Sequence, residues 1–371
     1  MIASVLKPVD DPRAFHRMGI TLSQANKYDL HIIGFPTKKL PQYPGITFHP
    51  LPQFARISWK RLSTPLLLLK KVAKLKPQLL IVNTHEYLIV SGLIRILFGT
   101  RIVYDVRENY FRNLVYTHTY PPLIRQALGG YVRGKEWVSK AWVRHYLLAE
   151  SGYQREFSFQ SPNFTVIQNT FQGEKANFIS KNVEERPIEI LISGTLAEHY
   201  GLFEAINYAI EFSKISPVRL RIIGYCPNKT TLQQLKRQIV KYKDIIILEG
   251  GERWVAHERI IEAIQQADIG LVAYPRHPAT ENCLPTKIFE YMAHQLPFFI
   301  TPLPHWIDYC ERFQAAIPVD FGDLRLETLR NALKTYQNTL FYPSGAPDEA
   351  FWTHSDGPKF TQVIDQLVHS K

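Results

Sequence analysis

The sequence predicts an α/β protein built from two tandem Rossmann-like, doubly wound domains with a cleft between them. The chain has 371 residues, and a typical domain holds about 100–200. Short apolar runs alternate with longer amphipathic stretches, which is the pattern of βαβ units. The apolar runs do not alternate internally, as expected for parallel strands that helices cover on both faces.

The first domain is predicted over residues 1–175. A helix over 63–76 ends before Pro77, because proline cannot continue a helix, and the apolar run after it indicates a buried strand. The predicted helices cover 14–25, 63–76 and 87–98, and the predicted strands cover 30–34, 79–82, 101–104, 142–148 and 165–167.

A polar, charged stretch over 180–187 predicts a linker to a second domain over 187–345. There the alternation restarts, and becomes less regular after Pro302. The predicted strands cover 188–193, 218–223, 245–248, 269–273 and 297–301, and the predicted helices cover 201–213, 230–241, 257–266 and 286–294. In the last segment, 346–371, a helix over 360–368 is expected to pack back on the first domain.

The chain carries 44 Lys+Arg against 33 Asp+Glu, a net charge of +11. This balance favours an acidic partner, either nucleic acid, anionic lipid or a phosphorylated substrate. No zinc finger, RNP box, helix-turn-helix or long basic block is present, so we expect no nucleic-acid partner. Three scattered cysteines exclude a disulfide framework, and no cysteine–histidine cluster suggests a metal. No signal-peptide core and no spanning apolar run occurs, so we expect a cytoplasmic protein.

Basic and aromatic residues are interspersed over 109–146. Three interpretations remain open for this stretch. It is the solvated face of ordinary helices, a nucleic-acid contact, or a helix pair that lies on a membrane, with Trp and Tyr at headgroup level and Arg and Lys on anionic lipid of the inner leaflet.

Several common motifs are missing. Without G-x-G-x-x-G, Walker A, H-E-x-x-H or G-x-S-x-G, the dehydrogenase, P-loop and α/β-hydrolase functions lose their main support. The most informative segment is 282–293, NCLPTKIFEYMA. Pro285 suits the start of a helix, and Lys287 and Glu290 share one face of it. A helix start with a lysine forms an anion site, and a carboxylate one turn on suits a ribose diol. A surface ion pair is the simpler alternative.

This segment resembles the P-x-K-x-x-E-Y-M-A-x-G-x-P signature of the nucleotide-sugar-dependent glycosyltransferases of family 4, which have the GT-B fold of two Rossmann-like domains. The likeness is strong over 188–301 and looser before it, where 7–13 and 103–110 are similar to bacterial surface-polysaccharide members. Two positions depart from the pattern. Asn282 stands where the family commonly has a glutamate, with Glu281 the nearest carboxylate, and Gln295 replaces a glycine.

The resemblance implies roles for residues of the second domain. Lys287, the Gly194–Thr195 backbone and the helix start are expected to stabilise the diphosphate leaving group, and Glu290 to hold the nucleotide ribose. Asn282, with the N–H groups of two neighbours, is expected to orient the donor sugar, and a tryptophan to flank the base. These further donor-side residues are Cys283, Leu284 and Trp254.

In the first domain, polar residues follow the predicted strands at their carboxyl ends, where open α/β sheets place ligands. One of His85, Asp105 or Glu108 is expected to position the acceptor hydroxyl, although each is also explained as a loop cap. Asp11 and Arg13 are candidates for the cleft, although Asp11 before Pro12 is equally typical of a helix N-cap.

The residues and the resemblance together predict a glycosyltransferase of the hexosyltransferase type that acts in surface-polysaccharide assembly. The resemblance further implies that it retains the anomeric configuration and needs no cofactor and no essential metal. Its expected partners are a nucleotide-sugar donor, a glycan or lipid-linked acceptor and anionic lipid at the inner face of the membrane. Two alternatives remain. One is a sugar-nucleotide 2-epimerase on the same fold, and the other a degenerate transferase kept as a binding or scaffold protein, which the amide at Asn282 would explain.

Overall fold

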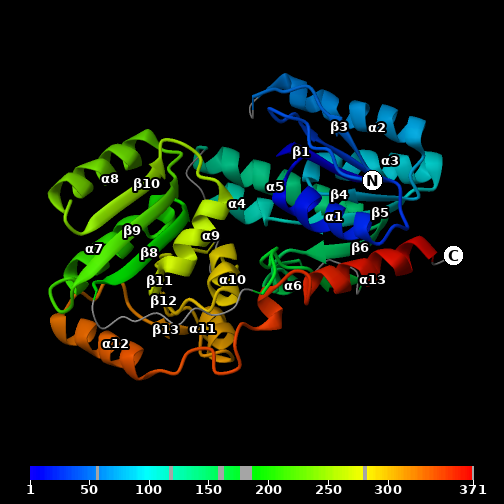
Figure 1. Cartoon of the computed structure of the whole chain (residues 1–371). Coiled ribbons are helices and arrows are strands. Elements are labelled where there is room, and N and C mark those ends of the chain that lie inside the picture. Colours follow the sequence, from blue (N-terminus) through cyan, green and yellow to red (C-terminus); the bar gives the residue numbers. More distant parts are fainter. Residues whose placement is uncertain (56–57, 117–119, 158–162, 176–185, 279–281, 370–371) are drawn as a thin grey trace. The chain divides into compact units, whose positions relative to one another are not determined.

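The computed structural model describes the chain apart from residues 56–57, 117–119, 158–162, 176–185, 279–281 and 370–371. Its contacts divide into two compact units (Figure 1). Unit 1 comprises Met1–Gln172, Pro278–Cys283 and Trp352–Lys371, and unit 2 comprises Gly173–His277 and Leu284–Phe351. Most of the expected linker, 180–187, and Glu281 lie outside the described residues.

The sheet of unit 1 has the order β3-β2-β1-β4-β5-β6-β7, and its strands pair in parallel. The strand order reverses between β1 and β4, and doubly wound sheets bind ligands at the carboxyl ends of such a pair. The strands are β1 (Ile2–Pro8), β2 (Leu30–Phe35), β3 (Ile46–Pro50), β4 (Leu79–Val82), β5 (Arg101–Val106), β6 (Val143–Leu148) and β7 (Phe164–Val166).

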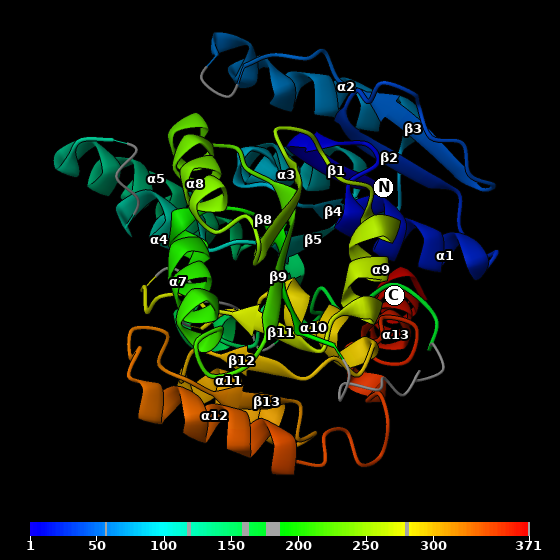
Figure 2. The same cartoon turned by 60° about the vertical axis from the view of Figure 1, so that its left-hand side comes forward.

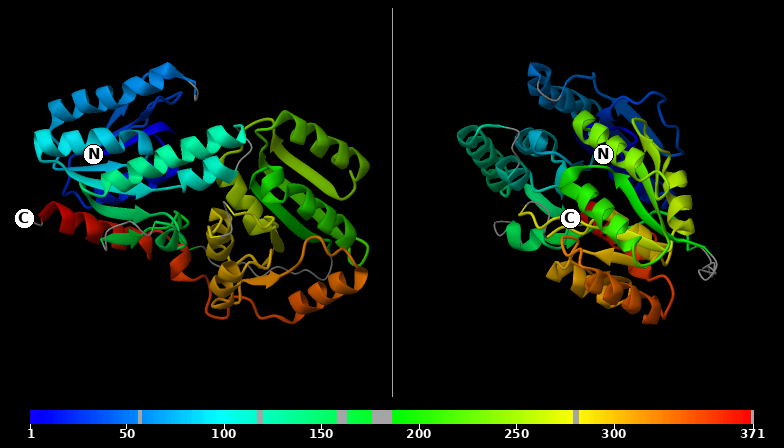
Figure 3. Two further views of the ribbon diagram at one scale, coloured as in Figure 1. Left: turned by 180° about the vertical axis from the view of Figure 1, so that it is seen from behind. Right: turned by 90° about the vertical axis from the view of Figure 1, so that its left-hand side faces the viewer.

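Helices cover both faces of this sheet. One core cluster joins the sheet to α2 (Thr64–Leu75) and α3 (Leu88–Phe98), and α5 (Pro122–Ser139) packs on α3. Another joins the sheet's other face to the first helical stretch and the last helix. Those elements are η1 (Pro12–Gly19), α1 (Ile20–Gln24) and α13 (Asp356–His369). The remaining helical elements are η2 (Trp59–Ser63), η3 (His85–Tyr87), α4 (Tyr110–Tyr116) and α6 (Tyr153–Glu156). In Figure 3 (left), α2, α3 and α5 lie in front of the sheet.

Unit 2 repeats the architecture, with a parallel sheet in the order β10-β9-β8-β11-β12-β13 that reverses between β8 and β11. Figure 2 shows α7 and α8 on one side of this sheet and α9 and α10 on the other. The strands are β8 (Ile188–Thr195), β9 (Val218–Tyr225), β10 (Ile246–Gly251), β11 (Ile269–Val272), β12 (Phe298–Ile300) and β13 (Ala316–Pro318). The helices are η4 (Glu198–Tyr200), α7 (Leu202–Phe212), α8 (Lys229–Lys241), α9 (His257–Gln266), α10 (Thr286–Ala293), α11 (Pro304–Glu311), α12 (Leu326–Asn338) and η5 (Asp348–Ala350).

The predicted fold class of two doubly wound α/β sheets is confirmed, and most elements predicted in 188–301 match within two residues. The strands β1, β3 and β13 were not predicted, because their short runs hold polar residues or proline. The C-terminal helix is longer than predicted and belongs to unit 1, where Trp352, Phe360 and Ile364 enter its core. Within the described residues, none of the helices has the length and apolar character needed to cross a membrane.

Candidate functional site

Three adjacent strands of unit 2 end in glycines that face one another across the sheet. Gly194 of β8 and Gly250 of β10 are both register partners of Gly224 of β9. All three have positive φ, of +93°, +91° and +149° respectively. A Cβ on Gly224 would lie 1.7 Å from the Gly194 carbonyl oxygen, and a Cβ on Gly250 would lie 2.4 Å from the Gly224 oxygen. Glycine is therefore required at these positions, and this glycine row lets a ligand approach the backbone at the strand ends.

The turn between β8 and α7 lies against the end of β11. Gly201, the residue before α7, has φ +72°, and a Cβ there would lie 1.7 Å from the Ala273 carbonyl oxygen. The first N–H groups of α7 are thereby held beside the point where the strand order reverses. The backbone of Thr195 and the helix start lie in this turn, for which the role of facing a diphosphate stays a prediction.

Helix α10 is fixed to the sheet by Tyr291. Its hydroxyl lies 2.9 Å from Ser193 Oγ on β8, and its ring packs on Gly270 of β11, where a Cβ would meet the ring at 2.5 Å. Gln295, just after the helix, adopts φ +53°, a conformation in which glycine is less strained. The helix is therefore held against β8 and β11, and its first turn lies beside Tyr274, just after the end of β11.

Lys287, in the first turn of α10, is a buried cation. Only 8% of the residue is exposed, and burial lowers the pKa of its ammonium to about 8, an effect that Glu290 opposes. Nζ lies 5.3 Å from the centroid of the Tyr274 ring. No carboxylate in the described part of the chain lies within ion-pair distance of it. An anionic ligand would stabilise an ammonium in such a place.

Glu290 lies one turn after Lys287 and contacts a histidine of α9. His257 Nε2 lies 2.9 Å from Glu290 Oε1, and the glutamate side chain is 18% exposed. The carboxylate is thus held in place while part of it remains accessible. The two residues do not form the surface ion pair with each other that the spacing alone allowed.

Trp254 follows β10 and stacks on Tyr225 at the end of β9. The ring centroids are 4.6 Å apart and the ring planes are inclined by 17°. Trp254 is nevertheless 80% exposed. An exposed aromatic face at the strand ends suits stacking of a planar base.

Asn282 and Cys283 belong to unit 1, whereas Leu284 is the first residue of the returning segment of unit 2. Asn282 Nδ2 donates to Glu156 Oε1 at 3.0 Å, and Arg112 Nη1 lies 2.9 Å from the same oxygen. Cys283 packs in the core of unit 1, where burial raises the pKa of its thiol to about 12. The Asn282 amide is therefore engaged by a carboxylate of the protein.

In unit 1, Asp105 and Arg13 form a buried ion pair. Asp105 is 0% and Arg13 2% exposed, and the guanidinium contacts Asp105 Oδ1 at 2.7 Å and the Ile167 carbonyl at 2.8 Å. Asp11 caps η1 by accepting from the Arg13 N–H at 3.0 Å and pairs with Arg107 at 2.7 Å. This geometry gives Asp105, Arg13 and Asp11 roles within the fold and favours the N-cap interpretation of Asp11 over a cleft role.

His85 and Glu108 differ in accessibility. Lys135 Nζ lies 2.9 Å from His85 Nδ1, so this nitrogen accepts, and Nε2 lies 3.6 Å from Glu86. Burial lowers the pKa of His85 to about 4, which keeps it neutral at pH 7. Glu108 is 42% exposed and pairs with Lys7 at 3.3 Å. Glu108 is therefore the more accessible of the two.

Sequence reasoning missed several of these features. Tyr274 and the glycines of β9 and β10 are brought to the site only by strand pairing. Lys7, which pairs with Glu108, was also not predicted as a site residue. It lies near the end of β1 and follows Leu6, whose φ of +62° is rare for a residue other than glycine. Glu156 was not predicted either. The only related feature of the sequence is Asn282, which stands where the family commonly has a glutamate and which donates to Glu156 in the structure.

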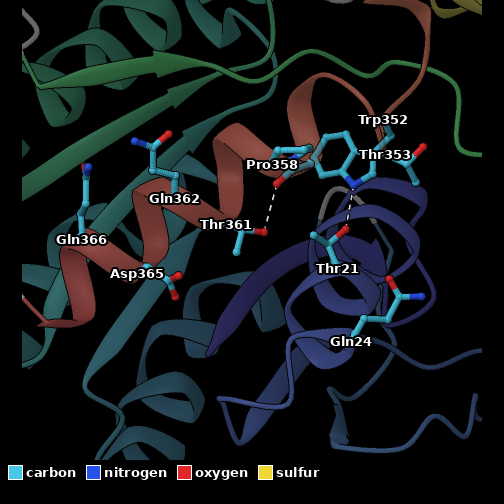
Figure 4. Close-up of a pocket in the computed structure, with 10 residues that line it drawn as sticks. Thr21, Gln24, Trp352, Thr353, Pro358, Thr361, Gln362, Asp365 and Gln366 are labelled. Atoms are coloured by element: carbon cyan, nitrogen blue, oxygen red, sulfur yellow. Dashed lines mark hydrogen bonds between the residues drawn. The ribbon is translucent and has the colours of Figure 1, made fainter. Parts of the chain in front are cut away.

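A hollow of about 560 Å³ lies on the face of unit 1 that η1, α1 and α13 cover (Figure 4). It runs between α1 and α13, where Trp352 Nε1 donates to Thr21 Oγ1 at 2.7 Å. It contains none of the predicted site residues. Within the described residues, no group of three or more His, Cys, Asp or Glu side chains forms a candidate metal site.

The sequence matches no family model and no curated protein. Several solved structures share its fold. Sucrose-phosphate synthase from Thermosynechococcus elongatus has a TM-score of 0.67 at 14% identity, covering 99% of this chain and 94% of that one. HepE of Anabaena, solved with UDP and glucose, has a TM-score of 0.64 at 13% identity, covering 100% and 99%. A glycosyltransferase from Rickettsia africae has a TM-score of 0.60 at 12% identity, covering 99% of this chain and 95% of that one. At these identities the likeness establishes the fold, which is that of the GT-B glycosyltransferases.

Proposed function

We propose that the protein is a glycosyltransferase that moves a sugar from a nucleoside-diphosphate sugar to a glycan or lipid-linked glycan acceptor. The observation that carries the proposal is Lys287, a buried cation without a carboxylate partner among the described residues, at the start of a helix on the ligand-binding edge of unit 2. A diphosphate supplies the negative charge that this ammonium lacks.

The proposed roles follow from what glycosyl transfer requires. The departing nucleoside diphosphate gains charge, which Lys287 and the N–H groups at the starts of α7 and α10 stabilise. The accessible carboxylate of Glu290 accepts hydrogen bonds from the ribose hydroxyls. Trp254 stacks on the base. Because protein groups compensate the diphosphate charge, we propose that no metal is essential.

Unit 1 would supply the acceptor side. Glu108, with Lys7, is the pair we propose to position an acceptor hydroxyl, because both side chains are partly exposed at strand ends beside the strand-order reversal. When the diphosphate leaves and the acceptor hydroxyl enters on the same face of the sugar, the anomeric configuration is retained. We propose this course for the transfer. A lipid-linked acceptor in surface-polysaccharide assembly would place the protein at the inner face of a membrane.

One observation favours a second candidate, a sugar-nucleotide-binding protein without turnover. Asn282, where a donor-orienting carboxylate was expected by resemblance, is bound to Glu156. Nothing favours the 2-epimerase in the same way.

Incubation with radiolabelled nucleotide sugars, with and without a bacterial lipid extract, separates these functions. Label that reaches an acceptor only when the extract is present supports transfer, and ¹H NMR of the new linkage reports retention. Binding without turnover supports the second candidate, and epimer formation without acceptor supports the 2-epimerase. The variant Lys287→Met should abolish turnover, whereas the matched control Lys334→Met, at an exposed lysine of α12, should not. Turnover that survives Lys287→Met would contradict the proposal.

A further inference from the structure

The outward side of α3 is apolar. Ile89, Leu93, Ile96 and Leu97 are 48%, 43%, 81% and 56% exposed. Their spacing of four, three and one residues places them on one face of the helix. The opposite face, with Ile94, is buried in the core. A helix with large apolar side chains on its outer as well as its inner side is normally covered on both sides.

The helices beside α3 continue this surface. Both α2 and α5 pack on α3, and Figure 3 (left) shows the three helices on one side of the sheet of unit 1. We call their outer side, with η2, the helical face. Its exposed large side chains, besides those of α3, are Trp59 (87%), Leu62 (69%), Leu66 (61%), Leu123 (87%), Ile124 (50%), Leu128 (36%), Tyr131 (64%), Trp137 (63%) and Val138 (46%). So many exposed apolar side chains on neighbouring helices indicate an interaction site.

The charge of the helical face has one sign. Helices α2, α3 and α5 contain seven basic residues and one acidic residue, Glu136. Glu136 is 1% exposed and accepts from the Tyr104 hydroxyl at 3.1 Å, so it presents no charge to the outside. The basic residues are Lys70, Lys71, Lys74, Arg95, Arg125, Arg133 and Lys135. Two of them are held by neighbouring side chains, because Arg133 pairs with Glu136 at 3.1 Å and Lys135 contacts His85 at 2.9 Å.

The three lysines of α2 line a hollow at one edge of the face. Its volume is about 270 Å³, and its other lining residues are apolar except for His49. Burial, reinforced by Lys71 and Lys74, lowers the pKa of His49 to about 4. The hollow therefore combines an apolar wall with positive charge, which suits a phosphate group attached to an aliphatic chain.

We propose that the helical face is a docking surface for a membrane that contains anionic lipid. Exposed Trp and Tyr side chains match the interfacial region of a bilayer, the leucines and isoleucines reach its acyl boundary, and the cations meet its phosphates. A second copy of the chain fits less well, because a symmetric contact would bring two surfaces of the same sign together.

The inference rests on the proposed function in one respect only. The purpose of membrane docking would be to bring the protein to a lipid-linked acceptor. Vesicle binding needs neither donor nor transfer. A protein that sediments with vesicles but transfers no sugar would contradict the proposed function alone, and one that transfers sugar without sedimenting would contradict this inference alone.

The test is co-sedimentation of the full chain with vesicles of equal parts phosphatidylglycerol and phosphatidylcholine, and with phosphatidylcholine alone, at low salt. We expect binding to the anionic vesicles and at least tenfold weaker binding to the neutral ones. Each lysine near such a surface contributes about fivefold, so the variant K70Q/K71Q/K74Q should bind about a hundredfold more weakly. The control K229Q/K241Q/K243Q removes the same charge from exposed positions on and beside α8 of unit 2 and should bind like the wild type.

A second pair of variants tests the apolar part. The change L93Q/I96Q/L97Q replaces exposed side chains and should abolish binding with an unchanged melting temperature, whereas V240Q/L340Q, exposed in unit 2, should not. Equal loss in the two lysine variants would overturn the proposal, as would failure of the wild type to sediment. Light scattering that shows an oligomer, dissociated by L93Q/I96Q/L97Q, would assign the face to self-association instead.

Discussion

Raising the pH should weaken donor binding through one residue, Lys287. Its pKa is about 8 in the free protein, so about nine-tenths of the molecules carry the charge at pH 7 and about one-tenth at pH 9. If only the charged form binds the diphosphate, the apparent affinity falls by this ratio, which is roughly tenfold or about 1.4 kcal/mol.

The stability of the free protein should change in the opposite direction. Lys287 has a lower pKa in the folded chain than its ordinary 10.5, so between about pH 8 and 10.5 the unfolded chain binds more protons. The contribution of this residue to the free energy of unfolding therefore rises with pH across that window. Because the deprotonation of Lys287 does not destabilise the folded protein, a loss of donor affinity at pH 9 without a loss of stability is assigned to binding and not to alkaline unfolding.

Isothermal titration calorimetry with UDP-glucose at pH 7, 8 and 9 measures the effect. Its diphosphate diester does not titrate in this range, and the Lys287→Arg variant, which stays charged, controls for the partial ionisation of the uracil N3–H near pH 9. Repeating the pH 9 titration in buffers of different ionisation enthalpy should reveal the uptake of about one proton per donor bound. Lys287→Arg should keep its affinity at pH 9, because arginine stays charged, and Lys287→Met should bind weakly at every pH. The exposed control Lys334→Met should behave as the wild type. An affinity that is the same at pH 7 and 9, or that Lys287→Met leaves unchanged, would refute the assignment.

Three further predictions concern the glycine row, the exposed tryptophan and the buried ion pair. Gly224→Ala should lower the free energy of unfolding by at least about 3 kcal/mol in urea denaturation, whereas Gly130→Ala, which meets nothing within 4 Å on α5, should raise it by about 0.4–1 kcal/mol; similar effects at both sites would contradict the steric argument. Trp254→Leu should weaken UDP-glucose binding about 5- to 15-fold, as expected for about 1–1.5 kcal/mol of stacking, with an unchanged melting temperature, and calorimetry that finds equal affinity would remove this residue from the site. Arg13→Met should cost about 3–5 kcal/mol, because it leaves the Asp105 carboxylate buried without a partner, and the double variant Arg13→Met/Asp105→Leu should recover most of it. A single variant as stable as the wild type would show that the pair is not structural.

The second half of the fold was predictable because its strands are continuous apolar runs separated by helices with good start and stop signals. The segment around Lys287 was predictable for the same reason, since proline, lysine and glutamate at fixed spacing describe one helix start. Contacts between side chains far apart in the sequence were not predictable. Arg13 and Asp105 are 92 residues apart, and the sequence suggested a ligand-binding role for both, whereas they bind each other.

The helical face was only half predicted. The stretch 109–146 was recognised by its mixture of basic and aromatic residues, which indicated either a solvated face or a membrane surface. The contribution of α3 was missed, because a sequence such as LIVSGLIRILF is typical of a helix buried on all sides. Only the absence of any described neighbour over Ile96, at 81% exposure, separates an outward apolar stripe from core.

The glycine row restricts how the specificity of this protein can evolve. At Gly194, Gly224 and Gly250 a neighbouring carbonyl or a left-handed backbone excludes larger residues, so this part of the proposed nucleotide site cannot acquire a new side chain by single substitutions. Adaptation to another sugar or base must then come from the loops that follow these strands, as at Trp254, where replacement leaves the sheet intact. Homologues with different donors should therefore be identical along the strand ends and divergent a few residues beyond them.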